Sequence, residues 1–277
     1  MNKSTSSYET PVYQYRIILL ILFIEIFIYF FSDIHISSFQ KNTFIGFEQD
    51  PLLWLVYFTG LPQLLLSNIY ILYFLDCFIL LLIIAVIIKP LNIWFAQGLL
   101  ILLFIFYTIF TAHLGHRNYQ SGYLFVLLPF LFFKVQNKQI IFEFTRYFLL
   151  FFYISAAFFK LESGSLFDPN HFSNAVTNQF TPYFLEQSYS LRTSFNLFLI
   201  THHSFAQSLY FGATILEFIA IIGFFTKRFD QYLAAGILLF HVANWFIMDI
   251  APIGQIAFIC TLFFSQKFGW KPSFYSI

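Results

Sequence analysis

A single lysine follows a long apolar run and is the first residue whose type and position suggest chemistry. Residues 147–159 carry no acidic or basic side chain, and Lys160 comes directly after them. A lysine near the end of a membrane span usually extends its ammonium group to the lipid–water interface, which is called snorkelling. A lysine shielded from water by Phe158 and Phe159, with Tyr153 and Ala156 on its own helix face, would instead lose a proton readily and act as a base. Both interpretations stay open at the level of sequence.

Four more ionisable side chains lie well inside apolar runs, where a charged group costs roughly 2.5–3.5 kcal/mol at the centre of a membrane helix. They are Glu25, Asp76, Glu217 and His241. Small residues one turn before Glu217 favour close approach of another helix. The Glu217 carboxylate would therefore either clasp a neighbouring helix, for example through His241, or belong to a functional site. For Glu25 and Asp76 we favour a structural hydrogen bond to another helix.

His241 begins a polar stripe on its own predicted helix. Trp245 follows four residues later and Asp249 eight residues later, so all three share one face, and Asn244 borders it. An imidazole carries protons near neutral pH, so His241 is a candidate catalytic residue, with Tyr153, Asn244 and Trp245 as candidate ligand-binding residues. The alternative is a histidine that bonds a neighbouring helix.

Two further histidines, His113 and His116, are three residues apart at the end of another predicted helix. That spacing would place two metal ligands on one face, but the sequence offers no obvious third ligand, so we predict no metal site. His116 remains a candidate catalytic residue.

The composition of the chain indicates which kind of fold must hold these residues. Of 277 residues, 59% are hydrophobic, 44 are Phe and only 10% are charged, whereas soluble domains average about 25% charged residues. The net charge of +1 and the lack of a basic face argue against nucleic acid as a partner. We therefore predict an all-α, polytopic integral membrane bundle with the lipid bilayer as its partner.

Hydropathy and turn residues predict about eight membrane-spanning helices in a single domain, residues 1–277. The spans are placed at 16–34, 68–88, 91–113, 121–137, 141–160, 205–226, 231–249 and 252–266. The segment 51–67 is apolar but broken by Gly60 and Pro62, which favours an interfacial or re-entrant position. The polar segment 161–204 is expected to form an outward loop that caps any site.

The distribution of Lys and Arg predicts the orientation of the chain. With the N-terminus in the cytoplasm, ten of the 14 basic residues fall on the inner side, and only Lys41, Arg117, Lys160 and Arg192 fall on the outer side. We therefore expect a multi-pass protein of the cell (inner) membrane with both termini cytoplasmic. Lys160 then stands at the outer end of its helix.

The run YISAAFFKLESGSLFDPNHF, which contains Lys160, resembles the signature of the HTTM (horizontally transferred transmembrane) family. This family includes the membrane core of vitamin K-dependent gamma-glutamyl carboxylase. A second block, YFGATILEFIAIIGFFTKRFDQYLAAGILLFH, is similar to the family's glutamate-bearing helix, basic turn and histidine-bearing helix, with Glu217 and His241 at the corresponding positions. The resemblance runs in order from about residue 16 to residue 266.

The resemblance implies an activity as well as a fold. In the carboxylase, the lysine of this motif is held to deprotonate reduced vitamin K, so Lys160 would be the base and a reduced quinone the cofactor. This chain departs from the pattern at two places: Phe159 replaces the first lysine of a pair, and Ser121 or Gly122 stands where the family has a histidine. His116 or His113 would have to substitute for that histidine. A large peptide-binding domain outside the membrane is also not among these residues, so we do not expect carboxylation of a protein.

Three functions remain as expectations. The first is a carboxylase-like or epoxidase-like enzyme acting on a quinone or peptide at the outer face of the membrane. The second is a non-catalytic accessory protein for the maturation, export or tolerance of a peptide, with a peptide or a small lipophilic ligand as partner. The third is a transporter or proton pathway, for which broken helices and inverted repeats would be typical, and we find no repeat. The oligomeric state is not predicted.

Overall fold

The computed structural model describes residues 6–31, 35, 37, 58–89, 92–114, 126–128, 138–185, 190–250, 252 and 254–265. No β-strand occurs in these ranges. Their helices are α1 (Ser6–Phe31), α3 (Leu61–Leu66), α4 (Ile69–Ile88), α5 (Ile93–Leu114), α7 (Lys138–Glu162), α8 (His171–Leu185), α9 (Leu191–Thr201), α10 (His203–Ile219), α11 (Ile222–Phe225), α12 (Asp230–Met248) and α13 (Gln255–Ser265).

Within the described residues, four helical segments are long and apolar enough to cross a membrane, and each coincides with a predicted span. They are Ile69–Ile88, Phe142–Glu162, His203–Phe225 and Asp230–Met248, with 20, 21, 23 and 19 residues. The all-α membrane bundle is thereby confirmed.

Three of the other four predicted spans also correspond to helices within the described residues. The spans at 91–113 and 252–266 correspond to helices α5 and α13, and the span at 16–34 corresponds to α1, which begins ten residues earlier than predicted, at Ser6. Only residues 126–128 of the span at 121–137 lie within the described residues. The total of eight spans therefore stays a prediction.

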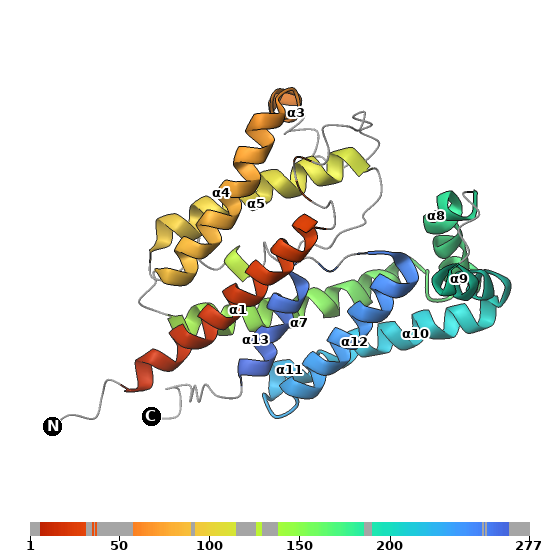
Figure 1. Ribbon diagram of the computed structural model, residues 1–277. Helices are drawn as coiled ribbons and strands as arrows, with labels where there is room; N and C mark the ends of the chain where they lie inside the picture. The colour runs from red at the N-terminus through yellow and green to blue at the C-terminus, as the bar shows by residue number, and fades with distance from the viewer. Residues whose placement is uncertain are drawn as a thin grey trace.

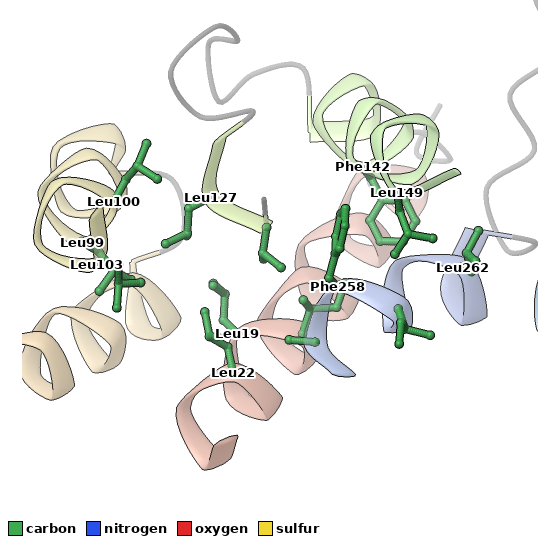
Figure 2. Close-up of a cluster of buried hydrophobic side chains, with 14 of the residues drawn as sticks. Leu19, Leu22, Leu99, Leu100, Leu103, Leu127, Phe142, Leu149, Phe258 and Leu262 are labelled. Carbon is green, nitrogen blue, oxygen red and sulfur yellow. The ribbon is translucent and has the colours of Figure 1, made fainter. Parts of the chain in front are cut away.

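The helices pack around α1 and α7, which lie side by side near the middle of the molecule (Figure 1). Helix α4 packs on α1 and pairs with α5, whereas α10, α12 and α13 lie on the other side with α7. Leucine and phenylalanine side chains from these elements meet in one core, labelled in Figure 2: Leu19, Leu22, Leu99, Leu100, Leu103, Leu127, Phe142, Leu149, Phe258 and Leu262. This core fixes the position of α7, which carries most of the polar residues discussed below.

The segment 161–204, predicted to be a polar loop between two spans, has secondary structure of its own. It contains the helices α8 and α9, which pack on one another and on α10 at one end of the bundle (Figure 1). Their apolar faces enclose a second, smaller core around Val176, Phe180 and Leu199. Each helix is short and mixes polar with apolar residues, so its apolar residues are too few to be distinguished by hydropathy alone. Whether this segment faces outward stays a prediction.

The predicted interfacial segment 51–67 is described only from residue 58. Its last part forms the short helix α3, which follows Gly60 in the left-handed region (φ 68°) and has a proline in its first turn. A glycine tolerates this backbone conformation without steric cost, so the sequence Gly-Leu-Pro breaks the chain and starts a new helix here. Residues 51–57 lie outside the described part.

The helix that contains Glu217 is interrupted near its end. Helix α10 stops at Ile219, and α11 resumes at Ile222 after a turn in which the amides of Ala220 and Ile221 bond to carbonyls three residues back. Backbone that leaves the regular helical pattern inside a membrane needs polar partners from the protein. An arginine on α7 bonds to a carbonyl of α11 just beyond this turn, as described below.

Candidate functional site

Helix α7 carries a polar stripe that faces the interior of the bundle. Glu143, Arg146, Tyr153 and Lys160 are separated by three, seven and seven residues, so they lie on one side of the helix. Seven residues correspond to two turns, or about 10 Å along the axis. Each of the four side chains bonds to a residue of another helix or of the turn that precedes α12. The stripe thus divides into three clusters, which we name by their order along α7: the inner cluster at Glu143 and Arg146, the middle cluster at Tyr153 and the outer cluster at Lys160.

The outer cluster is an ion pair between Lys160 and Glu217 of α10. The Lys160 Nζ atom lies 2.8 Å from Glu217 Oε1 and 2.7 Å from Oε2, so the ammonium group donates to both carboxylate oxygens. The Glu217 side chain is 4% exposed and the Lys160 side chain 18% exposed. Hydrogen bonds between two ionised groups are about twice as strong as neutral ones, which makes this pair a firm link between α7 and α10.

The direction of the Lys160 side chain argues against snorkelling. Tyr210 of α10 is level with the end of α7, because its hydroxyl lies 3.0 Å from the Ser165 hydroxyl in the turn that follows. Glu217 is seven residues further along α10, about 10 Å deeper in the bundle. Side chains on a helix tilt toward its N-terminus, which sends Lys160 back along α7 toward this carboxylate. The ammonium group is therefore held by a buried anion.

Two aromatic rings flank the ammonium group and were not identified from the sequence. The ring of Tyr210 is centred 5.1 Å from Lys160 Nζ, and the ring of Phe240 on α12 is centred 5.8 Å from it. Rings at this distance attract a cation and offer flat apolar surfaces to a ligand. Tyr210 shares a helix face with Glu217, which is the one sequence signal that would have singled it out.

The middle cluster joins three helices through Tyr153. The Tyr153 hydroxyl hydrogen-bonds to His241 Nε2 on α12, and Gln255 Nε2 at the start of α13 donates to the same hydroxyl at 2.8 Å. Tyr153, His241 and Gln255 are each 1% exposed. His241 was predicted to be a partner of Glu217, and this prediction was wrong: Glu217 bonds to Lys160, whereas His241 bonds to Tyr153. Gln255 was missed because nothing in its surroundings marks it as polar and buried.

The remaining candidates do not join these clusters. Trp245 is 49% exposed, and its carbonyl accepts a hydrogen bond from Arg192 of α9. Asn244 is half-buried, and neither side chain bonds to Lys160 or Glu217. His116 lies outside the described residues, as does the side chain of His113. Among the described residues, no three His, Cys, Asp or Glu side chains gather as a metal ion would require.

The inner cluster is a fully buried ion pair that the sequence did not reveal. Arg146 Nε and Nη2 donate to the two carboxylate oxygens of Asp230 at 2.7 and 2.8 Å, and both side chains are 0% exposed. Arg146 Nη2 also donates to the Gly223 carbonyl at 2.5 Å, which links α7 to α11 just beyond the turn at Ala220 and Ile221. Beside this pair, Lys227 bonds to Glu143. Arg146 had been assigned to the inner interface, whereas the structure buries it.

An apolar layer separates the inner cluster from the middle one. Leu149 and Leu150 lie between Arg146 and Tyr153 on α7, and both are fully buried. A β-carbon added at Gly223 would lie 2.6 Å from Leu150 Cδ2, which shows how closely α7 and α11 are packed here. Between Tyr153 and Lys160 the stripe instead contains Ala157. The polar path along α7 is therefore interrupted on the inner side.

Glu25 and Asp76 have the structural roles that were favoured for them. The Glu25 carboxylate on α1 accepts from the backbone amides of Ile256 and Ala257 at 3.1 and 3.2 Å, and so holds the first turn of α13. Asp76 on α4 accepts from the backbone amide and the hydroxyl of Ser37, at 3.1 and 2.7 Å. Both carboxylates connect segments that are distant in sequence.

Comparisons with known proteins add no assignment to this geometry. A scan against models of protein families, a search of curated proteins and a search of solved structures each found no match.

Proposed function

We propose that this protein is a membrane enzyme of the HTTM type, in which Lys160 and Glu217 perform acid–base chemistry on a lipophilic substrate. The observation that carries the proposal is the bidentate contact of the Lys160 ammonium with the buried Glu217 carboxylate, between the rings of Tyr210 and Phe240. An apolar pair of residues would usually hold two helices together as well as a buried ion pair does. The presence of a base and a cation here therefore favours a chemical role.

The geometry assigns a role to each member of the pair. When a substrate hydroxyl enters beside the pair, its O–H bond breaks, the proton goes to a carboxylate oxygen of Glu217, and the electron pair stays on the substrate oxygen. The Lys160 ammonium then donates a hydrogen bond to that oxyanion. This differs from the role that the family resemblance implies, in which the lysine itself takes the proton. Here its amine already carries a proton that is bound to Glu217.

A reduced quinone is the proposed substrate class. It would supply an acidic aromatic hydroxyl on a flat apolar ring, and the rings of Tyr210 and Phe240 are suited to such a molecule. The residues present are therefore compatible with it. The proposed location of this chemistry is the outer face of the cell membrane, with both termini in the cytoplasm.

The test uses the full-length protein in lipid nanodiscs with reduced menaquinone and oxygen, and epoxide formation as the readout. We expect Lys160→Met and Glu217→Gln each to lower the rate at least about 100-fold, because acid–base groups contribute 10²–10⁴-fold. Glu162→Gln, an exposed carboxylate next to the pair, is the matched control and should retain the wild-type rate. Failure of the wild type to turn over, or full activity in Lys160→Met, would refute the proposal.

A non-catalytic accessory role in peptide maturation, export or tolerance is the second candidate. This role is favoured if the Lys160–Glu217 ion pair is purely structural, because each side chain already satisfies the other and together they join α7 to α10. In that case both substitutions would lower stability while leaving no activity to lose. A proton pathway across the bilayer is less well supported, because Leu149 and Leu150 interrupt the polar stripe.

A further inference from the structure

The middle cluster contains a buried nitrogen atom that the protein leaves without a hydrogen bond. His241 bonds to Tyr153 through Nε2, whereas its other ring nitrogen, Nδ1, is buried and has no partner among the described residues. Buried polar atoms are nearly always hydrogen-bonded, and those that are not call for a functional explanation. This nitrogen is therefore available to a hydrogen-bonding group of a ligand.

The hydrogen bonds around Tyr153 determine which nitrogen carries the proton. Gln255 Nε2 donates to the Tyr153 oxygen, so the hydroxyl hydrogen is free to point toward His241. A buried hydroxyl hydrogen needs an acceptor, and His241 Nε2 is the one that the described residues offer it. We therefore assign the Tyr153 hydroxyl as the donor and Nε2 as the unprotonated nitrogen of a neutral ring. The proton of that ring then resides on Nδ1. A neutral imidazole in this tautomer presents an N–H donor in apolar surroundings, which suits an oxygen acceptor and not a cation.

The position of this donor connects it to the outer cluster. Tyr153 and Lys160 are two turns apart on α7, about 10 Å. Phe240, which flanks Lys160, is also the neighbour of His241, with ring centres 5.1 Å apart. A molecule of roughly two fused rings is long enough to reach both clusters.

We propose that Gln255, Tyr153 and His241 form a relay that fixes the proton on His241 Nδ1, and that this N–H binds a carbonyl-type oxygen of the molecule on which Lys160 and Glu217 act. The identity of that molecule rests on the proposed function, whereas the relay itself does not. Tyr153 and Gln255 are positioning residues, and His241 is the residue that contacts the ligand.

The first experiment is nitrogen NMR of full-length protein labelled with ¹⁵N-histidine in nanodiscs, with the His241 signals assigned from their absence in His241→Gln. We expect one tautomer with the proton on Nδ1. Tyr153→Phe should give a mixture of the two tautomers, because Nε2 loses its donor. Tyr147→Phe on the same helix, whose hydroxyl makes no hydrogen bond to any described residue, should leave the tautomer unchanged. A proton on Nε2 in the wild type, or no effect of Tyr153→Phe, would overturn the relay.

The second experiment adds ligands to the same labelled protein. The probes are α-tetralone, a bicyclic aromatic ketone, and tetralin, the hydrocarbon of the same shape. We expect the ketone to shift the Nδ1 resonance and the hydrocarbon to leave it unchanged. Equal effects of the two probes, or no effect of either, would overturn the acceptor subsite.

These outcomes separate this inference from the proposed function. If the Nδ1 tautomer and the ketone shift are found but Lys160→Met changes no activity, the relay stands and the acid–base role fails. If activity depends on Lys160 but His241 carries its proton on Nε2, the acid–base role stands and the relay fails. The tautomer measurement in the wild type needs no substitution in the cluster, so a poorly folded variant does not affect it.

Discussion

The Lys160–Glu217 pair offers the sharpest test of the structure, because removing one partner has different consequences from removing both. Lys160→Met would leave the Glu217 carboxylate, 4% exposed, without its two hydrogen bonds. Breaking a buried ion pair in this way costs about 3–5 kcal/mol. Glu217→Gln should cost less, about 1.5–3 kcal/mol, because the amide oxygen still accepts from Lys160, which also reaches water.

The double substitution provides the decisive comparison. Lys160→Met with Glu217→Gln removes the uncompensated charge, so the double variant should be more stable than Lys160→Met alone. If the two effects were independent, the double variant would instead be the least stable of the three. We expect a coupling energy of at least about 2 kcal/mol between the two positions.

The assay is the free energy of unfolding of the purified protein in mixed micelles, titrated with a denaturing detergent. Glu162→Gln is the control, since an exposed carboxylate should change stability by no more than about 0.5 kcal/mol. Additive effects, with a coupling energy below about 0.5 kcal/mol, would mean that the two side chains do not meet as the structure places them. A double variant with recovered stability but no activity would favour a functional site over a clasp.

Three further predictions concern the parts of the bundle that hold α7 and α13. Arg146→Met should lower the free energy of unfolding by about 3–5 kcal/mol, and adding Asp230→Leu should restore part of that loss, both measured by titration with a denaturing detergent. An equal loss in the single and the double variant would contradict the buried ion pair. Glu25→Gln should cost about 0.5–2 kcal/mol and speed hydrogen exchange at the first amides of α13, and unchanged exchange would argue against the cap. Gly223→Ala should lower the free energy of unfolding by about 1–3 kcal/mol, because the new β-carbon clashes with Leu150, and Leu150→Ala in the same chain should relieve part of that loss. No change in thermal unfolding of Gly223→Ala would mean that α7 and α11 pack less closely than the structure shows.

The bundle and several of its elements could be predicted from the sequence because hydropathy is a local property. Four predicted spans agree with the long apolar helices of the structure, since each such run must be helical and buried in lipid. Lys160, Glu217 and His241 also stood out without a structure, because an ionisable residue in an apolar run has an energetic cost that calls for a partner. The family resemblance and the activity that it implies remain proposals.

The pairings depended on the tertiary structure. Glu217 was expected to meet His241 on the next helix, but the antiparallel register of α7 and α10 places Lys160 beside it instead. Tyr153 and Gln255 are separated by 102 positions, and no pattern along the chain connects them. The helices α8 and α9 could not be predicted within the polar segment, because short amphipathic helices bury too few residues to stand out. Sequence thus determined which residues needed partners in the membrane, and the packing of helices against one another decided which partner each of them found.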